Sequence, residues 1–176
     1  EVARLTSIVE GLLAIARSEA ASSEKIVVDI AKIASERIEA WQALGEERGV
    51  TVAFEGPESL QCVAIPNAVE QVIDNYIDNA ISHSPANSAV LVRIYDSQES
   101  ALLEVIDSGP GLSKDQCEKA FDRFWRADST KEGSGLGLAI VRQLTEMCGG
   151  SVKLSPRGEG QTGIIAVAEF RKPASQ

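Results

Sequence analysis

The sequence predicts an α+β fold in which helices cover one face of a single β-sheet. Strand-like and helix-like segments are mixed along the chain without a regular βαβ repeat. The helix-like segments carry apolar residues at spacings of three and four, as helices packed against a sheet do. With 176 residues, of which 44% are hydrophobic, the chain is long enough for one full core, or one core plus an appendage.

Residues 1–20 form the first predicted helix, because apolar residues recur there at helical spacing. This stripe needs a partner surface, and two remain open: the chain's own domain, or the other arm of a helical hairpin or dimer bundle. The residues at 20–23 have the composition of a short linker. We therefore divide the chain into an appended helix at 1–22 and a main domain at 23–176. The stripe consists of Leu5, Ile8, Val9, Leu12, Leu13 and Ala16.

The first half of the main domain alternates between strand and helix patterns. A short apolar run precedes a helical stripe that includes Trp41 and ends near Gly49. Two more short runs have strand character. Pro66 then opens a helix, at the first-turn position where proline is tolerated. The predicted elements are a strand at 26–28, a helix at 30–48, strands at 50–54 and 60–65, and a helix at 66–82.

The second half begins with an antiparallel pair of strands joined by a polar turn at 96–100. Ser113 starts the next helix, and Gln116 completes a capping box with it. A last apolar helix stops at Gly149, since glycine commonly ends helices. The predicted elements are strands at 89–95 and 101–106, a helix from 113, a helix at 136–148, and strands at 151–154 and 164–170.

Composition excludes several classes of function. A net charge of −9 repels phosphate backbones, so nucleic-acid binding is not expected. Three widely spaced cysteines without a CxxC pair argue against a disulfide framework or a zinc site, and a reducing compartment fits best. Apolar runs are shorter than the ~20 residues of a membrane-spanning helix. The chain has no initiator Met and no signal peptide, and we expect it to be an excised fragment.

Asn75 and Asn79 lie four residues apart, so both amides project from one face of the predicted helix. Mg²⁺ prefers hard oxygen ligands and needs few from the protein when phosphates supply others, and an amide oxygen ligates it without adding charge. The alternative is two asparagines that hydrogen-bond within the helix. Taken alone, the pair favours that alternative.

Asp107 ends a predicted strand and precedes Gly109 and Gly111. A carboxylate at a strand end can accept a hydrogen bond from the exocyclic amine of adenine, and glycines let the backbone approach a flat base. An ordinary turn, which Asp, Gly and Pro favour, is the alternative and is favoured for this motif alone.

The glycines Gly133, Gly135 and Gly137 surround the start of the helix that opens at Leu136. Exposed N–H groups and the helix dipole attract phosphate there. The motif is not the dinucleotide fingerprint, because a polar stretch rather than a strand precedes it. A flexible hinge is the alternative, and a mobile lid over 111–133 would use both properties. Cations that could touch phosphates in or near this lid are Arg123, Arg126 and Lys131, for which solvated surface charge is an equal alternative.

His83, the only histidine, follows one turn after Asn79. Its side chain could act as a general base, a metal ligand or a phosphate acceptor, or its ring could stack on a base. A partly exposed polar residue at a helix end is the simplest alternative.

Four motifs in this order resemble the catalytic, ATP-binding domain of sensor histidine kinases, within the group that includes gyrase, Hsp90 and MutL ATPases. The resemblance covers about 24–171. It implies a two-layer α/β sandwich of the Bergerat type with a mixed sheet, and the helix before it resembles the second helix of the family's dimerisation domain. The motifs are Asn75-Tyr-Ile-Asp-Asn79 (N box), Asp107-Ser-Gly-Pro-Gly111 (G1 box), Phe121-Asp-Arg-Phe124 (F box) and Gly133-Ser-Gly-Leu-Gly137 (G2 box).

The resemblance implies roles for these residues. Asn79 and Asn75 would hold Mg²⁺ as metal ligands and catalytic residues, Asp107 would read adenine, and His83 would stack on the base. Gly109 and Gly111 would shape the base pocket, whereas Gly133, Gly135, Leu136 and Gly137 would line the phosphate end. The cations Arg123, Arg126 and Lys131 would position phosphates, and Thr162 would contact the base.

Two positions bear on how the chain would bind and use ATP. Ser82 stands where a phosphate-contacting lysine is common, which predicts some loss of ATP affinity. Asn75 stands where the ATPase relatives carry a general-base glutamate. An amide cannot take a proton from water at neutral pH, so ATP should persist for transfer to another acceptor.

The resemblance also implies partners. We expect a full-length homodimer with its own dimerisation/phosphoacceptor domain, whose histidine lies before residue 1, and a response regulator receiver domain. The localisation expected is cytoplasmic, as the inner part of a membrane-anchored bacterial sensor. This chain alone is expected to bind Mg-ATP without phosphorylating itself. Two rivals stay open: an anti-sigma-factor-type protein-serine kinase and a non-catalytic nucleotide-sensing scaffold.

Overall fold

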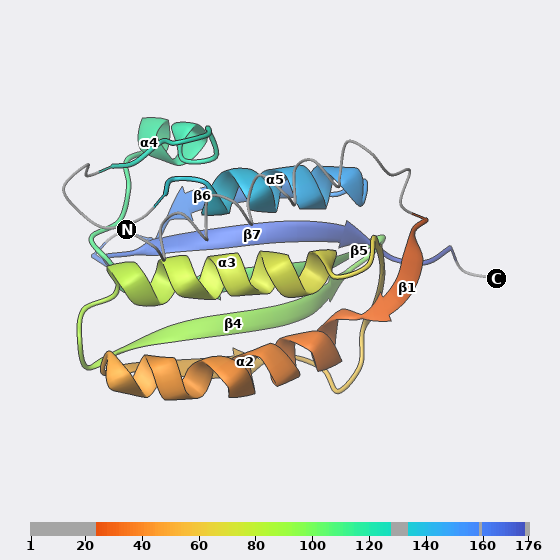
Figure 1. The fold of residues 1–176 in the computed structure, drawn as a ribbon, viewed down its shortest axis with the longest axis horizontal. Helices are drawn as coiled ribbons and strands as arrows, with labels where there is room; N and C mark the ends of the chain where they lie inside the picture. The colour runs from red at the N-terminus through yellow and green to blue at the C-terminus, as the bar shows by residue number, and fades with distance from the viewer. Residues whose placement is uncertain (1–23, 128–133, 159, 175–176) are drawn as a thin grey trace.

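The computed structural model describes residues 24–127, 134–158 and 160–174, and these form two layers. Helices α2, α3 and α5 lie side by side across one face of a five-stranded sheet (Figure 1). The elements in chain order are β1 (Ile26–Asp29), α2 (Ile30–Glu47), β2 (Val50–Glu55), β3 (Gln61–Ala64), α3 (Ala68–His83), β4 (Ser88–Ser97), β5 (Ser100–Ile106), α4 (Lys114–Lys119), α5 (Gly137–Met147), β6 (Ser151–Pro156) and β7 (Ile164–Arg171).

The main sheet has the strand order β2-β4-β5-β7-β6. β2 pairs with β4 in parallel, and the other neighbours pair antiparallel, so the sheet is mixed as expected. In β4, β5 and β7, buried and half-buried residues alternate, which places the core between this sheet and the helices. β1 and β3 form a separate two-stranded sheet, an addition to the single predicted sheet.

Within the described residues the predicted elements are confirmed, with two corrections. The 66–82 helix begins at Ala68 rather than at Pro66, because Asn67 takes a left-handed conformation with φ of 62° that interrupts the helical path. The β4–β5 connection is shorter than 96–100, since Ser97 pairs directly with Ser100. The capping box of Ser113 is present as predicted.

α3 is fixed in rotation by contacts on two sides. Tyr76 is buried, and its hydroxyl donates to the carbonyl of Val167 on β7 at 3.0 Å. Asp74 accepts hydrogen bonds from Arg37 Nε at 2.7 Å and from Trp41 Nε1 at 2.8 Å, both on α2. These contacts occupy two sides of α3 and leave a further polar face directed away from the sheet.

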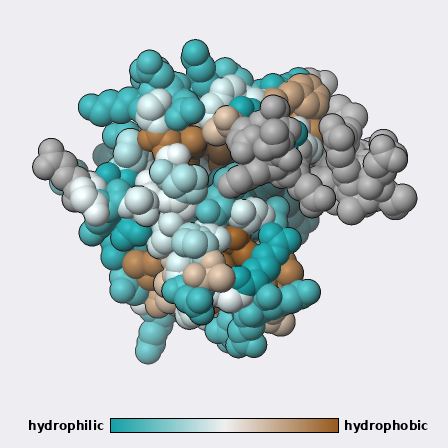
Figure 2. Space-filling model, turned by 90° about the vertical axis from the view of Figure 1, so that its left-hand side faces the viewer, coloured by the Kyte–Doolittle hydropathy of each residue, from teal (hydrophilic) through white to brown (hydrophobic). Residues whose placement is uncertain are grey.

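α2 and α3 end on the same side of the molecule, at the left of Figure 1. Figure 2 views this side, which is mostly hydrophilic with apolar surface in small separate areas. Within the described residues no helix is long and apolar enough to cross a membrane.

Candidate functional site

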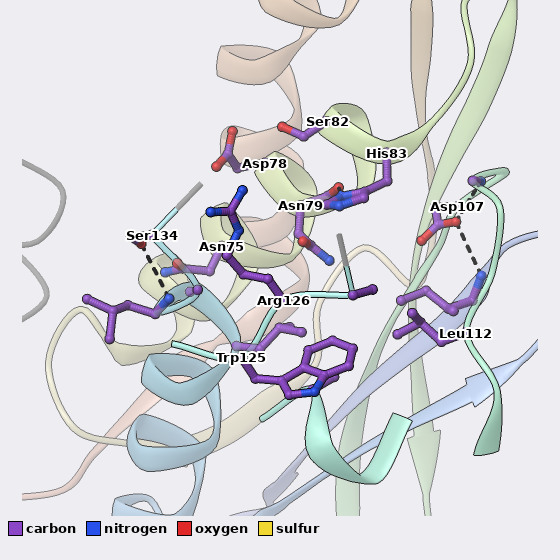
Figure 3. A pocket seen from close by; sticks show the side chains of 18 of the residues that line it. Asn75, Asp78, Asn79, Ser82, His83, Asp107, Leu112, Trp125, Arg126 and Ser134 are labelled. Atoms are coloured by element: carbon purple, nitrogen blue, oxygen red, sulfur yellow. Dashed lines mark hydrogen bonds between the residues drawn. The ribbon is translucent and has the colours of Figure 1, made fainter. Parts of the chain in front are cut away.

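A cavity of about 540 Å³ lies beside the C-terminal half of α3, a volume typical of small-molecule sites (Figure 3). The loop after β5 and the start of α5 form its other walls. The structure thus brings three of the four sequence motifs to one place, together with Trp125 and Arg126, which follow the fourth. The predicted site residues among its lining are Asn75, Asn79, His83, Asp107, Gly109, Gly111, Arg126, Gly135, Leu136 and Gly137.

One wall is a polar stripe on α3, made of Asn75, Asp78, Asn79 and Ser82. Their spacing of three, one and three residues keeps them on one helix face. The Asn75 amide nitrogen donates to the carbonyl of Gln71 at 2.7 Å. Within the described residues the amide oxygen of Asn75 has no hydrogen-bond donor, so it can accept a hydrogen bond or ligate a cation. Its role in holding a metal stays a prediction.

The opposite end of the cavity carries Asp107, which is only 4% exposed. Its Oδ1 accepts hydrogen bonds from the backbone N–H of Gly109 at 2.8 Å and of Ile164 at 3.2 Å. Because both bonds fall on Oδ1, Oδ2 is available to the cavity (Figure 3). Burial raises the pKa of Asp107, while these two N–H groups and the charges of His83 and Arg157 act in the opposite direction.

Two contacts that the sequence gave no reason to expect hold Asp107 in place. Arg157 Nη1 donates to the Asp107 carbonyl at 3.0 Å. Gly163, with φ of +107°, presses against the same residue, so that a Cβ there would lie 2.8 Å from the Asp107 carbonyl carbon. The hairpin between β6 and β7 thereby fixes the backbone that carries the carboxylate.

The glycines before α5 make close contacts across the site. Phe124 donates its N–H to the Gly135 carbonyl at 2.9 Å, and a Cβ on Gly135 would lie 2.9 Å from the Phe124 Cα. A Cβ on Gly137 would lie 3.0 Å from Asn75 Oδ1. These two glycines thus let the F box and the N-box helix approach the start of α5. Their expected approach to phosphates stays a prediction.

Arg126 brings a half-buried positive charge to the cavity. Its side chain points toward the part of α3 that carries Asn75 and Asp78 (Figure 3). Its Nη2 is buried without a hydrogen-bond partner in the described structure. An unpaired buried guanidinium nitrogen is costly, so this position favours an anionic ligand between Arg126 and α3.

The remaining predicted residues fall in three groups. His83 lines the cavity rim, and its Nδ1 lies 2.8 Å from the Asn79 carbonyl oxygen. Arg123 and Thr162 are exposed and do not line the cavity, so their phosphate and base contacts stay predictions. Lys131, Gly133 and the 1–20 helix lie outside the described residues.

Sequence reasoning missed the apolar side of the cavity. Leu112, Trp125, Ile140 and Ile164 line it from four separate segments. In the sequence, Trp125 is one more aromatic residue after Phe121 and Phe124, and the other three look like ordinary core residues. These side chains form a surface on which a flat, apolar ring face can lie close to Asp107.

Comparisons with known proteins agree with this geometry. The model of the "Histidine kinase-, DNA gyrase B-, and HSP90-like ATPase" family matches residues 64–173, more than half of the chain. The sensor protein KdpD of Clostridium acetobutylicum is 29% identical over 89% of this chain and 18% of its own length. The first curated relatives are matched over only 18 to 47% of their length, so the chain corresponds to a part of them.

Two solved structures share the fold. Full-length ShkA, determined in complex with AMPPNP, has a TM-score of 0.81 and 29% identity, over 97% of this chain and 37% of that one. ThkA, determined in complex with the response regulator protein TrrA, has a TM-score of 0.78 and 23% identity, over 98% of this chain and 48% of that one. The family match and the cavity together identify the chain: it belongs to the histidine kinase-, DNA gyrase B- and HSP90-like ATPase family, as an ATP-binding catalytic domain of the sensor histidine kinase type.

Proposed function

We propose that this chain binds Mg-ATP and positions its γ-phosphoryl group for transfer to a histidine outside the chain. The observation that carries the proposal is the difference between the two ends of the cavity. One end offers a buried carboxylate, Asp107, beside apolar surface, which suits adenine. The other offers the amides of α3 and the unpaired guanidinium nitrogen of Arg126, which suit a triphosphate.

The donor set fits Mg²⁺. Asn75 and Asn79 present uncharged oxygens, and the engaged amide nitrogen of Asn75 leaves its Oδ1 for a cation. Among the described residues no group of three His, Cys, Asp or Glu side chains could hold a metal alone. This donor set therefore suits a cation that takes most of its ligands from phosphates and water. When bound, Mg²⁺ neutralises phosphate charge that would otherwise oppose transfer.

At the position on α3 where the ATPase relatives carry a general-base glutamate, the cavity wall carries the amide of Asn75. An amide cannot accept the proton of an attacking water. The chain contains one histidine, and His83 is engaged with the Asn79 carbonyl on the cavity rim. ATP bound here is therefore held for an acceptor that another domain supplies.

The relatives suggest which domains those are. Sensor kinases such as KdpD extend well beyond the matched region, and ThkA was determined with a response regulator. We propose that the parent protein is a homodimer whose dimerisation domain carries the acceptor histidine, and that a response regulator receives the phosphoryl group. The chain would then act on the cytoplasmic side of a membrane-anchored sensor.

A phosphotransfer assay tests this function. The chain is mixed with labelled ATP, Mg²⁺ and the dimerisation domain of its parent protein, and the label is followed onto that domain. Acid-labile phosphohistidine is expected, and Asn79→Ala should abolish it. Acid-stable phosphoserine would favour the anti-sigma-factor type of kinase instead, and binding of ATP without any transfer would favour a nucleotide-sensing scaffold.

A further inference from the structure

An arginine outside the sequence motifs reaches the edge of the cavity. Arg48 caps the C-terminus of α2, and its Nη1 donates to the hydroxyl of Ser82 at 3.2 Å. Ser82 belongs to the polar stripe of α3 that lines the cavity. Both side chains are exposed, on the side of the molecule where α2 and α3 end. The guanidinium therefore stands one hydrogen bond from the cavity wall, with solvent access to it.

The backbone fixes where Arg48 begins. Its N–H donates to the carbonyls of Leu44 and Gly45 at 3.2 and 3.1 Å. Gly45 is buried, and a Cβ there would lie 3.2 Å from Val52 Cγ2, so the last turn of α2 sits directly on β2. From this fixed backbone the side chain of Arg48 extends to Ser82 on the cavity wall.

The cavity lining has more negative than positive side chains, so an anionic ligand would be bound better with another cation nearby. Its lining contains two carboxylates, Asp78 and Asp107, against the single guanidinium of Arg126 among the described residues. The hydrogen bond to Ser82 holds Arg48 one helical turn from Asp78, which lies on the same wall of the cavity as Ser82.

We propose that Arg48 is a phosphate-positioning residue that supplies the second guanidinium of the triphosphate end, opposite Arg126. In the free protein the guanidinium of Arg48 donates a hydrogen bond to Ser82. With nucleotide bound, this guanidinium turns from the Ser82 hydroxyl to a phosphate oxygen. Arginine suits this task because its planar fork can pair with two phosphate oxygens. The inference rests on the proposed function, since it needs a polyphosphate in the cavity.

The test compares Arg48→Ala with Lys32→Ala, which removes the same charge from the exposed start of α2. Affinities for ATP, ADP and adenosine are measured by calorimetry and by displacement of a fluorescent nucleotide. Arg48→Ala should weaken ATP about five- to tenfold, the usual range for one exposed charge-assisted hydrogen bond, and leave adenosine unchanged. Lys32→Ala should change neither. Raising the salt concentration should shrink the effect on ATP.

Two further variants separate direct from indirect action. Ser82→Lys in the Arg48→Ala background returns a cation to the same place and should restore most of the lost ATP affinity. In an Asp78→Asn background, Arg48→Ala should still weaken ATP, because Arg48 acts on phosphate rather than through Asp78. An Arg48→Ala effect that vanishes in that background would overturn the inference.

Other outcomes are equally decisive. If Arg48→Ala binds ATP as the unaltered chain does, while Asn79→Ala loses it, the inference fails and the proposed function stands. If adenosine weakens as much as ATP, Arg48 supports the fold rather than the phosphates, and the inference also fails. If the unaltered chain binds no ATP, the proposed function falls and takes the inference with it.

Discussion

Replacing Gly163 by alanine should lower stability and should disturb the carboxylate of Asp107, which we propose reads adenine. Gly163 has φ of +107°, and a Cβ there would lie 2.8 Å from the Asp107 carbonyl carbon and 2.9 Å from Asp107 Oδ1. The same hairpin loop offers two matched controls. Gly160 has φ of +78° but no atom within 4 Å of its Cβ position. Gly158 has neither a positive φ nor a neighbour within 4 Å.

The three glycines separate backbone strain from crowding. Gly158→Ala should be neutral or should stabilise by up to ~1 kcal/mol, because alanine restricts the unfolded chain. Gly160→Ala should destabilise by about 1–2 kcal/mol, the cost of a left-handed conformation for a residue with a Cβ. Gly163→Ala adds overpacking of about 1–3 kcal/mol to a similar backbone cost, giving about 2–5 kcal/mol in all.

Urea unfolding measures the three stabilities from the midpoint and slope of each transition. ATP titration of the folded variants measures the functional consequence. Gly163→Ala should also lose ATP affinity, because relief of the clash moves Asp107, whereas the two controls should bind normally. Equal destabilisation by Gly160→Ala and Gly163→Ala, with normal ATP binding in both, would refute the idea that Gly163 holds the carboxylate.

The remaining predictions concern pH, the lid contact and the thiols. In the proposed mode of binding, the carboxylate form of Asp107 accepts a hydrogen bond from adenine. Burial raises the pKa of Asp107, so ATP affinity should decline as pH falls through that raised value, whereas Asp107→Asn should bind weakly without this dependence. An unaltered chain with the flat pH profile of Asp107→Asn would contradict this prediction. Gly135→Ala places a Cβ 2.9 Å from Phe124 Cα at φ of +68°, and calorimetry should show weaker ATP binding; unchanged affinity would show that the contact is dispensable. All three cysteines are buried, and burial raises the pKa of Cys62 to about 12, so alkylation followed by mass spectrometry should report no labelling at pH 8 below the urea transition. Rapid labelling of the native chain would mean that the core around Cys62 opens locally.

Signals that are local in sequence predicted the fold well. The capping box of Ser113 and the glycine stop after α5 depend on residues within a few positions of each other, and both are present. Pro66 misled because proline at the first helical turn and proline just before a helix look alike in sequence. The left-handed conformation of Asn67 places Pro66 before α3 rather than in its first turn. The parallel pairing of β2 with β4 joins strands separated by α3 and β3, so no local pattern reports it.

For the site too, residues in local motifs could be predicted from the sequence, whereas contacts between distant residues could not. Asn75, Asn79 and Asp107 are recognisable because their chemistry and their order along the chain are distinctive. Arg48 lies 34 residues from Ser82, and Arg157 lies 50 residues from Asp107, and each pair meets only through tertiary structure. An isolated arginine at a helix end or in a loop carries no signal of such a partner.

The most direct test of the account is a calorimetric titration with ATP, with and without Mg²⁺. The unaltered chain, Asn79→Ala and Asp107→Ala are compared. The account predicts binding by the unaltered chain that Mg²⁺ strengthens, loss of that metal dependence in Asn79→Ala, and loss of preference for adenine over guanine nucleotides in Asp107→Ala. No binding by the unaltered chain, or binding indifferent to both substitutions, would contradict the assignment of this cavity to Mg-ATP.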